Sequence, residues 1–254
     1  MRRARLGCVL LTIAFLVACG TSDSKPAPSS LSGNWSITLN RHAATDPQTF
    51  SGFLVQSGDT LSGSVILGDG CSGVGPVTGT LDGQNLNMTI SEFGQDLNLA
   101  GTAPTGNGIL SGGFSTLPGG CTAFPNTGTW VAQLVPPIHG TFHGTLTSAR
   151  NGTTNVDGDL EQGDNTGAST AALTGAVTAT IPQQFCNYLT TATISGSISG
   201  THVTLNIFGP GGVQITQIEA STTPDATSMT GPYVFQGISN TCFGDQGVFQ
   251  ITFP

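Results

Sequence analysis

The residues best suited to chemistry in this sequence are a histidine pair and an acidic cluster near the middle of the chain. His139 and His143 lie four residues apart in PPIHGTFHGTL, and Asp157, Asp159 and Glu161 alternate shortly afterwards. Imidazoles bind metal ions or transfer protons, whereas carboxylates bind Ca²⁺ or act in pairs on glycosidic bonds. Which of these reactions is feasible depends on the elements that carry the side chains.

The histidine pair lies in a segment with the pattern of a strand, whose apolar face is set by Phe142 and Leu146. Side chains four residues apart in a strand share a face but lie about 13 Å apart. One metal ion therefore cannot contact both imidazoles directly. We expect His139 and His143 to point away from the core and to be ordinary surface residues.

The acidic cluster DGDLEQGDN spans residues 157–165. In a strand Asp157, Asp159 and Glu161 share one face, and with Asp164 in the following turn they form a weak candidate Ca²⁺ site. The segment departs from an EF-hand loop, because glutamine stands where that loop needs glycine. A solvated strand face is the favoured interpretation, so we expect no metal and no cofactor.

Recognised catalytic motifs are missing from the sequence. His42 and His202 have no acid or serine partner close to them in the sequence, and neither Gly-x-Ser-x-Gly nor His-Glu-x-x-His occurs. Paired carboxylates that cleave glycosides often work beside aromatic platforms, but aromatic residues are 7% of the chain and fall mostly at core positions. The sequence predicts no catalytic residues and no enzymatic activity.

The N-terminus has the pattern of an export signal. Three arginines precede an apolar run, residues 6–18, which is short for a membrane span and typical of a signal peptide at 1–18. The run ends in Leu16-Val17-Ala18-Cys19, which resembles the lipobox of bacterial lipoproteins. The resemblance implies cleavage before Cys19 and its lipidation, and the following Gly20 favours the outer membrane. The alternative is an ordinary secretory signal with a chance cysteine.

The mature chain is strongly acidic. It keeps three cations, Lys25, Arg41 and Arg150, against 14 acidic residues, which gives a formal net charge of −11. Nucleic acid is therefore excluded as a partner, because phosphate binding needs a basic surface. Acidic lipid headgroups would be repelled too, so attachment to a membrane must come from the lipid. The Ser/Pro-rich segment 19–30 is the expected flexible tether.

The remainder of the chain predicts an all-β fold. It contains 37 glycines, only 8% charged residues and no long helical periodicity. Glycine occupies an apolar-face position in Leu61-Gly63-Val65 and Leu110-Gly112-Phe114, which favours the strong coiling of a small up-and-down barrel. Two β-sandwiches are the alternative. The strands expected in the first half are 33–39, 50–57, 60–67, 76–83, 85–91, 96–103, 109–117 and 127–135.

The two halves of the chain echo one another. LSGNWSITL at 31–39 matches IHGTFHGTL at 138–146, and further landmarks follow in the same order. We interpret the chain as two diverged copies of one domain, 31–135 and 138–254, joined by Pro136-Pro137. Each copy is expected to form about eight strands.

Four cysteines remain in the folded part, and an even set outside the cytoplasm indicates disulfides. Four cysteines allow three connectivities, and the repeat favours Cys71–Cys121 and Cys186–Cys242. Each bridge would close a loop of about 50 residues and contribute about 4 kcal/mol in the chain-entropy model. Cys71 and Cys121 both lie in loops at the same end of an up-and-down barrel, so the bridge would lie across that mouth.

The first expected strand begins with Gly33-x-Trp35, which resembles the opening of lipocalin and avidin barrels. The resemblance implies a ligand cavity beside Trp35 and Trp130. The sequence as a whole predicts a lipid-anchored envelope protein that acts as a non-catalytic binding or structural module. Its expected partners are the membrane, through the lipid, and a small apolar ligand or an envelope component. A calycin-like carrier of small apolar ligands and an envelope hydrolase are the alternatives.

Overall fold

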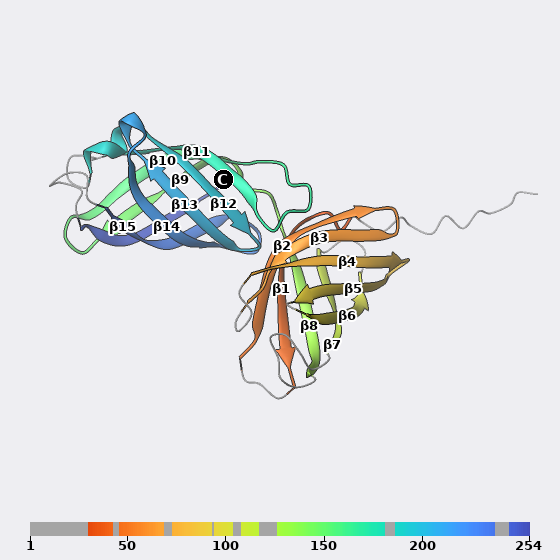
Figure 1. Cartoon of the computed structure of the whole chain (residues 1–254). Coiled ribbons are helices and arrows are strands. Elements are labelled where there is room, and N and C mark those ends of the chain that lie inside the picture. The colour runs from red at the N-terminus through yellow and green to blue at the C-terminus, as the bar shows by residue number, and fades with distance from the viewer. Residues whose placement is uncertain are drawn as a thin grey trace, which may run out of the picture.

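The chain forms two closed antiparallel β-barrels of eight strands each, as predicted (Figure 1). The computed structural model describes residues 30–42, 46–68, 73–92, 94–103, 108–116, 126–180, 186–236 and 244–254. The signal peptide, Cys19 and most of the tether lie outside these ranges. No helix in the described part of the chain is long and apolar enough to cross a membrane.

The first barrel precedes Pro136-Pro137, and its strands pair in sequence order until β8 closes on β1. Its strands are β1 (Gly33–Arg41), β2 (Gln48–Ser57), β3 (Thr60–Ile66), β4 (Val74–Asp82), β5 (Asn85–Glu92), β6 (Gln95–Thr102), β7 (Ile109–Thr116) and β8 (Asn126–Val135). Every bound lies within two residues of the sequence prediction.

The second barrel follows the two prolines, and β16 closes on β9. Its strands are β9 (His139–Ser148), β10 (Gly152–Gln162), β11 (Ala171–Ala179), β12 (Ala192–Ser199), β13 (His202–Phe208), β14 (Gln214–Thr222), β15 (Ser228–Phe235) and β16 (Gln246–Thr252). Two short 3₁₀ helices, η1 (Asn187–Thr190) and η2 (Pro210–Gly212), lie between strands.

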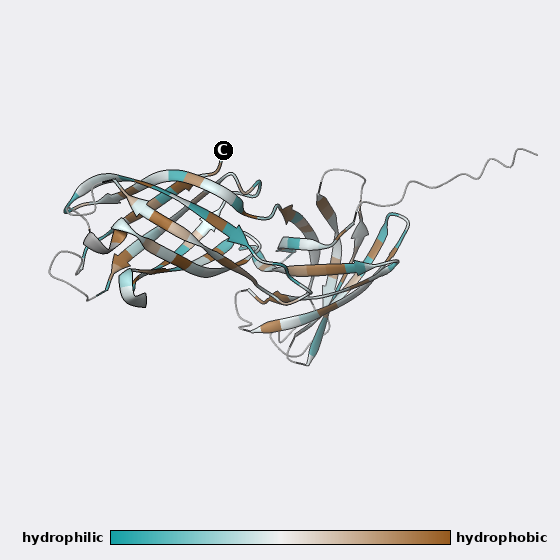
Figure 2. Cartoon of the chain, turned by 90° about the horizontal axis from the view of Figure 1, so that it is seen from above, coloured by the Kyte–Doolittle hydropathy of each residue, from teal (hydrophilic) through white to brown (hydrophobic). Residues whose placement is uncertain are grey.

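Hydrophobic and hydrophilic residues alternate along many of the strands (Figure 2), and the apolar ones are buried inside each barrel. In β1, Trp35, Ile37 and Leu39 are each 1% exposed, and the same phase recurs in β5 with Leu86 and Met88. An eight-stranded barrel has an interior just wide enough for side chains to fill. The core of each barrel is therefore packed by the inward residues of its own strands.

Inward glycines let neighbouring strands cross closely. A Cβ atom at Gly112 would overlap the carbonyl oxygen of Ala100 on β6, and one at Gly175 would overlap that of Asp159 on β10. Gly112 lies on β7 of the first barrel and Gly175 on β11 of the second, so close crossing at a glycine occurs in both barrels. Close backbone approach at an inward glycine gives the strong coiling that closure of a small barrel requires.

The two barrels are joined by direct hydrogen bonds as well as by the linker. We call this region of contact the joint between the barrels. The side-chain nitrogen of Asn34 on β1 donates to the carbonyl oxygen of Gly200 at 2.8 Å, and the Gly200 N–H donates back to Asn34 Oδ1 at 2.6 Å. The hydroxyls of Ser51 on β2 and Ser199 on β12 lie 2.9 Å apart. The β12–β13 turn of the second barrel therefore rests on the outer face of β1 and β2.

Phe53 completes this joint. It lies between Gly52 and Leu54 on β2, and Leu54 belongs to the core of the first barrel. Phe53 therefore points outward, yet it is 4% exposed because it packs into the hydrophobic cluster of the second barrel. The first barrel thus contributes a side chain to the core of the second.

Candidate functional site

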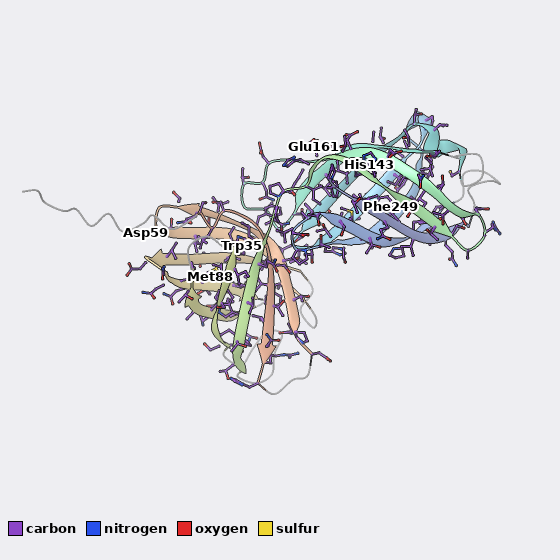
Figure 3. The ribbon with its side chains drawn as sticks, turned by 180° about the vertical axis from the view of Figure 1, so that it is seen from behind. Trp35, Asp59, Met88, His143, Glu161 and Phe249 are labelled. Atoms are coloured by element: carbon purple, nitrogen blue, oxygen red, sulfur yellow. The ribbon has the colours of Figure 1, made fainter. Side chains whose placement is uncertain are left out.

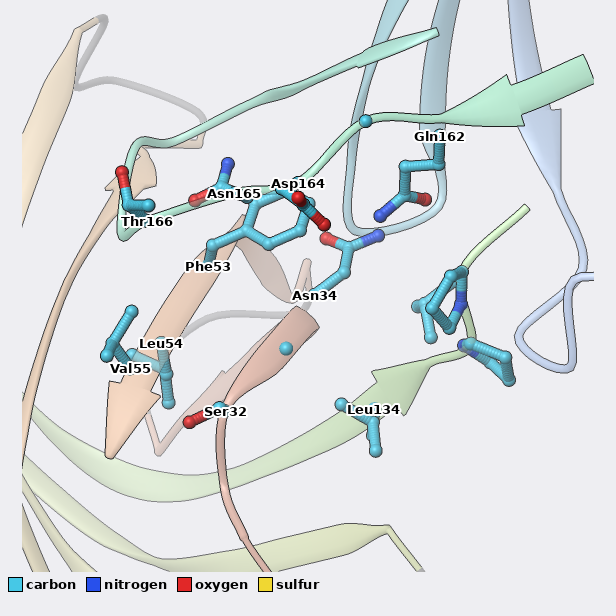
Figure 4. A pocket seen from close by; sticks show the side chains of 15 residues that line it. Ser32, Asn34, Phe53, Leu54, Val55, Leu134, Gln162, Asp164, Asn165 and Thr166 are labelled. Atoms are coloured by element: carbon cyan, nitrogen blue, oxygen red, sulfur yellow. The ribbon is translucent and has the colours of Figure 1, made fainter. Parts of the chain in front are cut away.

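A cleft of about 570 Å³ lies where the two barrels meet (Figure 4). One wall comes from the first barrel and includes Val55 on β2 and Leu134 on β8. The other comes from the loop 163–170 between β10 and β11, and Pro136-Pro137 joins the two walls. Small-molecule sites typically have 300–1,000 Å³, mostly apolar walls and a few polar groups, and they often lie at domain interfaces. This inter-barrel cleft has all of these features.

The loop that forms the second wall is fixed by its own polar side chains. The Asn165 amide nitrogen donates to the Thr170 carbonyl oxygen at 2.6 Å, and Asn165 Oδ1 accepts from Gly167 N–H at 2.7 Å. Gln162 Oε1 accepts from the Ile138 N–H at 3.2 Å. The cleft is therefore bounded by a structured loop, and most of the polar groups in it are already engaged.

Asp164 differs from these neighbours. Among the described residues that line the cleft it alone carries a formal charge, it is exposed, and no hydrogen bond or ion pair to it is found among the described residues. By its place in the sequence Asp164 was a candidate ligand of a weak Ca²⁺ site, together with the acids of β10. In the structure the Asp164 carboxylate lies among the cleft side chains, as Figure 4 shows.

The three alternating acids remain on the outer face of β10, as expected, and Asp157, Asp159 and Glu161 are all exposed. Glu161 Oε1 accepts from the Gly140 N–H at 3.3 Å. Within the described ranges, no three His, Cys, Asp or Glu side chains gather as a metal site would require. The arrangement is that of a solvated strand face.

His139 and His143 are both exposed, which confirms the expectation for that strand. His143 is labelled on the second barrel in Figure 3. The register pairs His143 with Asp157 across β9 and β10, and their Nδ1 and Oδ1 atoms lie 2.6 Å apart. Both side chains are more than half exposed. Pairs of this kind contribute about 1 kcal/mol or less.

His202 also has an acidic partner that the sequence analysis missed. Its Nε2 atom lies 3.2 Å from Glu219 Oε2 on β14, and Glu219 additionally accepts from Thr204 at 2.9 Å. The two residues are 17 positions apart, so only strand register reveals the pair. Alternation along β13 and β14 predicts that both side chains point outward, but it does not predict that they lie next to one another.

The two tryptophans suggested as cavity residues lie in packed cores. Trp35 is 1% exposed and its indole N–H donates to the Leu31 carbonyl oxygen at 2.8 Å. Trp130 is fully buried and its indole N–H donates to the Gly113 carbonyl oxygen at 3.0 Å. Neither belongs to the lining of the inter-barrel cleft. A free space of about 10 Å³ lies inside the second barrel beside Tyr233, enough for about one water molecule.

A buried polar cluster lies at the end of the second barrel away from the cleft. Asp245 is 2% exposed and accepts from the hydroxyls of Ser148 and, at 3.2 Å, Tyr233. Burial raises the pKa of Tyr233, and the nearby Asp245 carboxylate raises it further. These hydrogen bonds tie the segment before β16 to β9 and β15.

Cys186 is fully buried and is disulfide-bonded. Cys71, Cys121 and Cys242 lie outside the described residues. The pairing of Cys71 with Cys121 and of Cys186 with Cys242 stays a prediction.

Comparison with known proteins gives fold-level likenesses. No family model matches the chain, and no curated protein matches it. Isotype 1 transferrin binding protein B from serogroup B Neisseria meningitidis matches over 86% of this chain and 62% of its own length, with 8% identity and a TM-score of 0.29. The chain therefore spans less than two thirds of that protein.

Two further structures are similar to the same degree. Intact Ap-TbpB, with its N and C lobes, is 9% identical over 89% of this chain and 77% of its own, with a TM-score of 0.26. A Nostoc punctiforme protein of unknown function from the DUF3598 family is 10% identical over 87% of this chain and 96% of its own, with a TM-score of 0.25. Function is therefore inferred from the cleft itself.

Proposed function

We propose that this chain is a non-catalytic binding module of the bacterial cell envelope, and that it takes a small ligand in the inter-barrel cleft. The observation that carries the proposal is the contrast between this cleft, of about 570 Å³, and the free space of about 10 Å³ inside the second barrel. A ligand of ordinary size fits the cleft but not that interior.

The joint between the barrels supports this assignment. Asn34 and Gly200 exchange two hydrogen bonds, and Phe53 anchors the first barrel in the core of the second. The two walls of the cleft are thereby held at a fixed separation. A preformed site loses less conformational freedom on binding than one that must close around its ligand.

The envelope location rests on the N-terminal sequence. The lipobox-like Leu16-Val17-Ala18-Cys19 supports a lipid anchor, and the segment up to residue 30 would separate the barrels from the bilayer. The net charge of the mature chain would hold the barrels away from acidic headgroups. The alternative of a carrier with its ligand inside the barrel has less support, because the free space inside the second barrel is about 10 Å³. The hydrolase alternative has less support, because the described cleft lining contains no histidine, cysteine or paired carboxylate.

Fluorescence titration with the neutral apolar dye Nile red tests the proposal. The mature chain, residues 19–254, is made without its signal peptide so that no lipid competes for the dye. We expect one saturable site per chain. Thr166→Trp is expected to weaken binding by about tenfold or more, because Thr166 is exposed and lines the cleft, so the new indole occupies ligand volume.

Ala168→Trp is the matched control. Ala168 is exposed on the same loop but is absent from the cleft lining, so its replacement should leave dye affinity unchanged. Absence of saturable binding, or equal binding by the two tryptophan variants, would overturn the proposal.

A further inference from the structure

We infer that the inter-barrel cleft selects amphipathic monocations, that is, ligands with a compact apolar body and one ammonium-type head. This inference rests on the proposed function, because it concerns the ligand of the same site. It is carried by the placement of Asp164 in an otherwise uncharged, mostly apolar lining.

The walls of the cleft favour an apolar body. Phe53, Val55 and Leu134 face it from the first barrel, and Pro136 and Pro137 form the strip between the barrels. Burial of apolar surface contributes about 25 cal/mol per Å² in the area-transfer description. The amide nitrogens of Asn34 and Asn165 already donate to backbone carbonyl oxygens, whereas Gln162 uses its Oε1 to accept from the Ile138 N–H.

The charge of the cleft favours a cation. The Asp164 carboxylate is open to solvent and carries the single formal charge of the described cleft lining. Charges of one sign along a low-dielectric cleft raise the local concentration of opposite ions. The same negative potential would repel an anionic ligand.

The basic residues of the described chain lie at the far ends of the barrels. Arg41 ends β1, whereas the cleft lies at the Gly33 end, a separation of about 26 Å along the strand. Arg150 follows the end of β9, whereas the cleft lies near the beginning of that strand. Each arginine is thus separated from the cleft by the length of a strand, which exceeds the Debye length of about 8 Å at physiological ionic strength. Neither arginine therefore neutralises Asp164.

Isothermal titration of the mature chain with three ligands that share a naphthylmethyl body tests this inference. The ligands are 1-naphthylmethylammonium, neutral 1-naphthylmethanol and anionic 1-naphthylacetate. At low salt we expect the cation to bind about fivefold more tightly than the neutral compound, which is the upper range for an exposed charge pair, and the anion to bind most weakly. The preference should shrink as ionic strength rises.

Asp164→Asn keeps the shape of the side chain and removes its charge. This substitution should lower the affinity for the cation to that for the neutral compound. The affinity for the neutral compound itself should not change. Asp82→Asn is the control, because Asp82 is exposed at the end of β4 and is not part of the cleft lining. It should leave the fivefold preference intact.

The two proposals fail in different ways. If the neutral compound binds the wild-type cleft as tightly as the cation, or if Asp164→Asn leaves the ratio unchanged, cation selection is overturned and the cleft remains a binding site. If none of the three ligands binds, and Nile red binding is insensitive to Thr166→Trp, the proposed function itself is overturned.

Discussion

The Asn34 side chain and the Gly200 backbone exchange two hydrogen bonds, which join residues 166 positions apart on different barrels. Asn34 is 2% exposed although it lies at an outward position of β1. An amide side chain has one donor side and one acceptor side, and Asn34 uses both on the backbone C=O and N–H of a single residue. The relative position of the barrels is therefore fixed by a specific contact.

Replacement of Asn34 should remove this contact and make the folded chain less stable. We expect Asn34→Ala to lower the free energy of unfolding by about 1–3 kcal/mol, because it leaves the buried N–H and C=O of Gly200 without their partner. Urea denaturation of the mature chain measures the change. Asn40→Ala is the control on the same strand, since Asn40 is exposed, and it should change stability by less than about 0.5 kcal/mol. Equal losses in the two variants would contradict the role of Asn34.

Gly200 should tolerate no side chain. Its φ is +56°, and a Cβ atom there would lie 2.6 Å from Ser51 Cβ on the first barrel. We expect Gly200→Ala to cost about 1–3 kcal/mol for the left-handed backbone and more for the overlap. Gly152→Ala isolates the backbone contribution, because Gly152 has a φ of +77° and open space around its Cβ position.

Thermal unfolding measures the melting temperatures of the two glycine variants. We expect Gly200→Ala to lower the melting temperature more than Gly152→Ala does. The double variant Ser51→Gly with Gly200→Ala should recover part of the difference. Equal falls in the two single variants would show that the barrels do not press on one another at this turn.

Phe53 should behave as a core residue. We expect Phe53→Ala to lower the free energy of unfolding by about 3 kcal/mol, as for a buried phenylalanine in a packed core. Val131→Ala on β8 provides the contrast, because Val131 is outward and 43% exposed, and it should cost less than about 1 kcal/mol. A loss for Phe53→Ala as small as that for Val131→Ala would contradict packing of Phe53 against the second barrel.

Stability should fall at alkaline pH because of Tyr233. Burial and the Asp245 carboxylate raise the pKa of Tyr233 above the ordinary value for tyrosine, about 10, so the folded state favours the neutral phenol. A raised folded pKa gives stability that is present below pH 10 and is lost as pH rises above it. The free energy of unfolding, measured by urea denaturation between pH 9 and 11, should therefore fall with increasing pH.

Tyr233→Phe removes this pH-dependent component. At neutral pH it should cost about 1.5–3 kcal/mol, because the buried Asp245 carboxylate loses a hydrogen-bond donor. The other tyrosine, Tyr188, remains and serves as the reference in an ultraviolet titration of tyrosinate. An identical alkaline slope in wild type and variant would contradict the prediction.

The histidine pair that is most conspicuous in the sequence should have little effect on stability. His143→Gln breaks an exposed contact with Asp157 and should change the free energy of unfolding by less than about 1 kcal/mol. Zinc titration of the wild type should show no site that depends on both His139 and His143. A stoichiometric zinc site abolished by His143→Gln would refute the surface interpretation.

Much of the fold followed from local pattern. Alternation in β1, the apolar-face glycines such as Gly112 and Gly175, and the turn residues predicted eight strands per half to within two residues in the first barrel. This worked because strand period, closure and coiling are properties of consecutive residues. The outward position of His143 followed from the same periodicity.

The joint between the barrels and the inter-barrel cleft could not be predicted from local sequence pattern. Phe53 and Asn34 lie at outward positions, which local alternation assigns to solvent, and they are buried only because the second barrel covers them. When SGFLVQSGD at 51–59 is aligned with DGDLEQGDN at 157–165, Phe53 matches Asp159. The outward face is therefore covered at Phe53 in the first barrel and exposed at Asp159 in the second.

The sequence by itself determined that this protein is an all-β chain of two small barrels, with an acidic surface and a lipobox-like N-terminus. Composition and period 2 suffice for these properties, because each depends on residue type and neighbours along the chain. The tertiary structure decided where Asp164 lies, which face of β2 is buried and where free volume remains. These depend on contacts between residues more than 100 positions apart, such as Asn34 and Gly200, and no local pattern encodes such contacts.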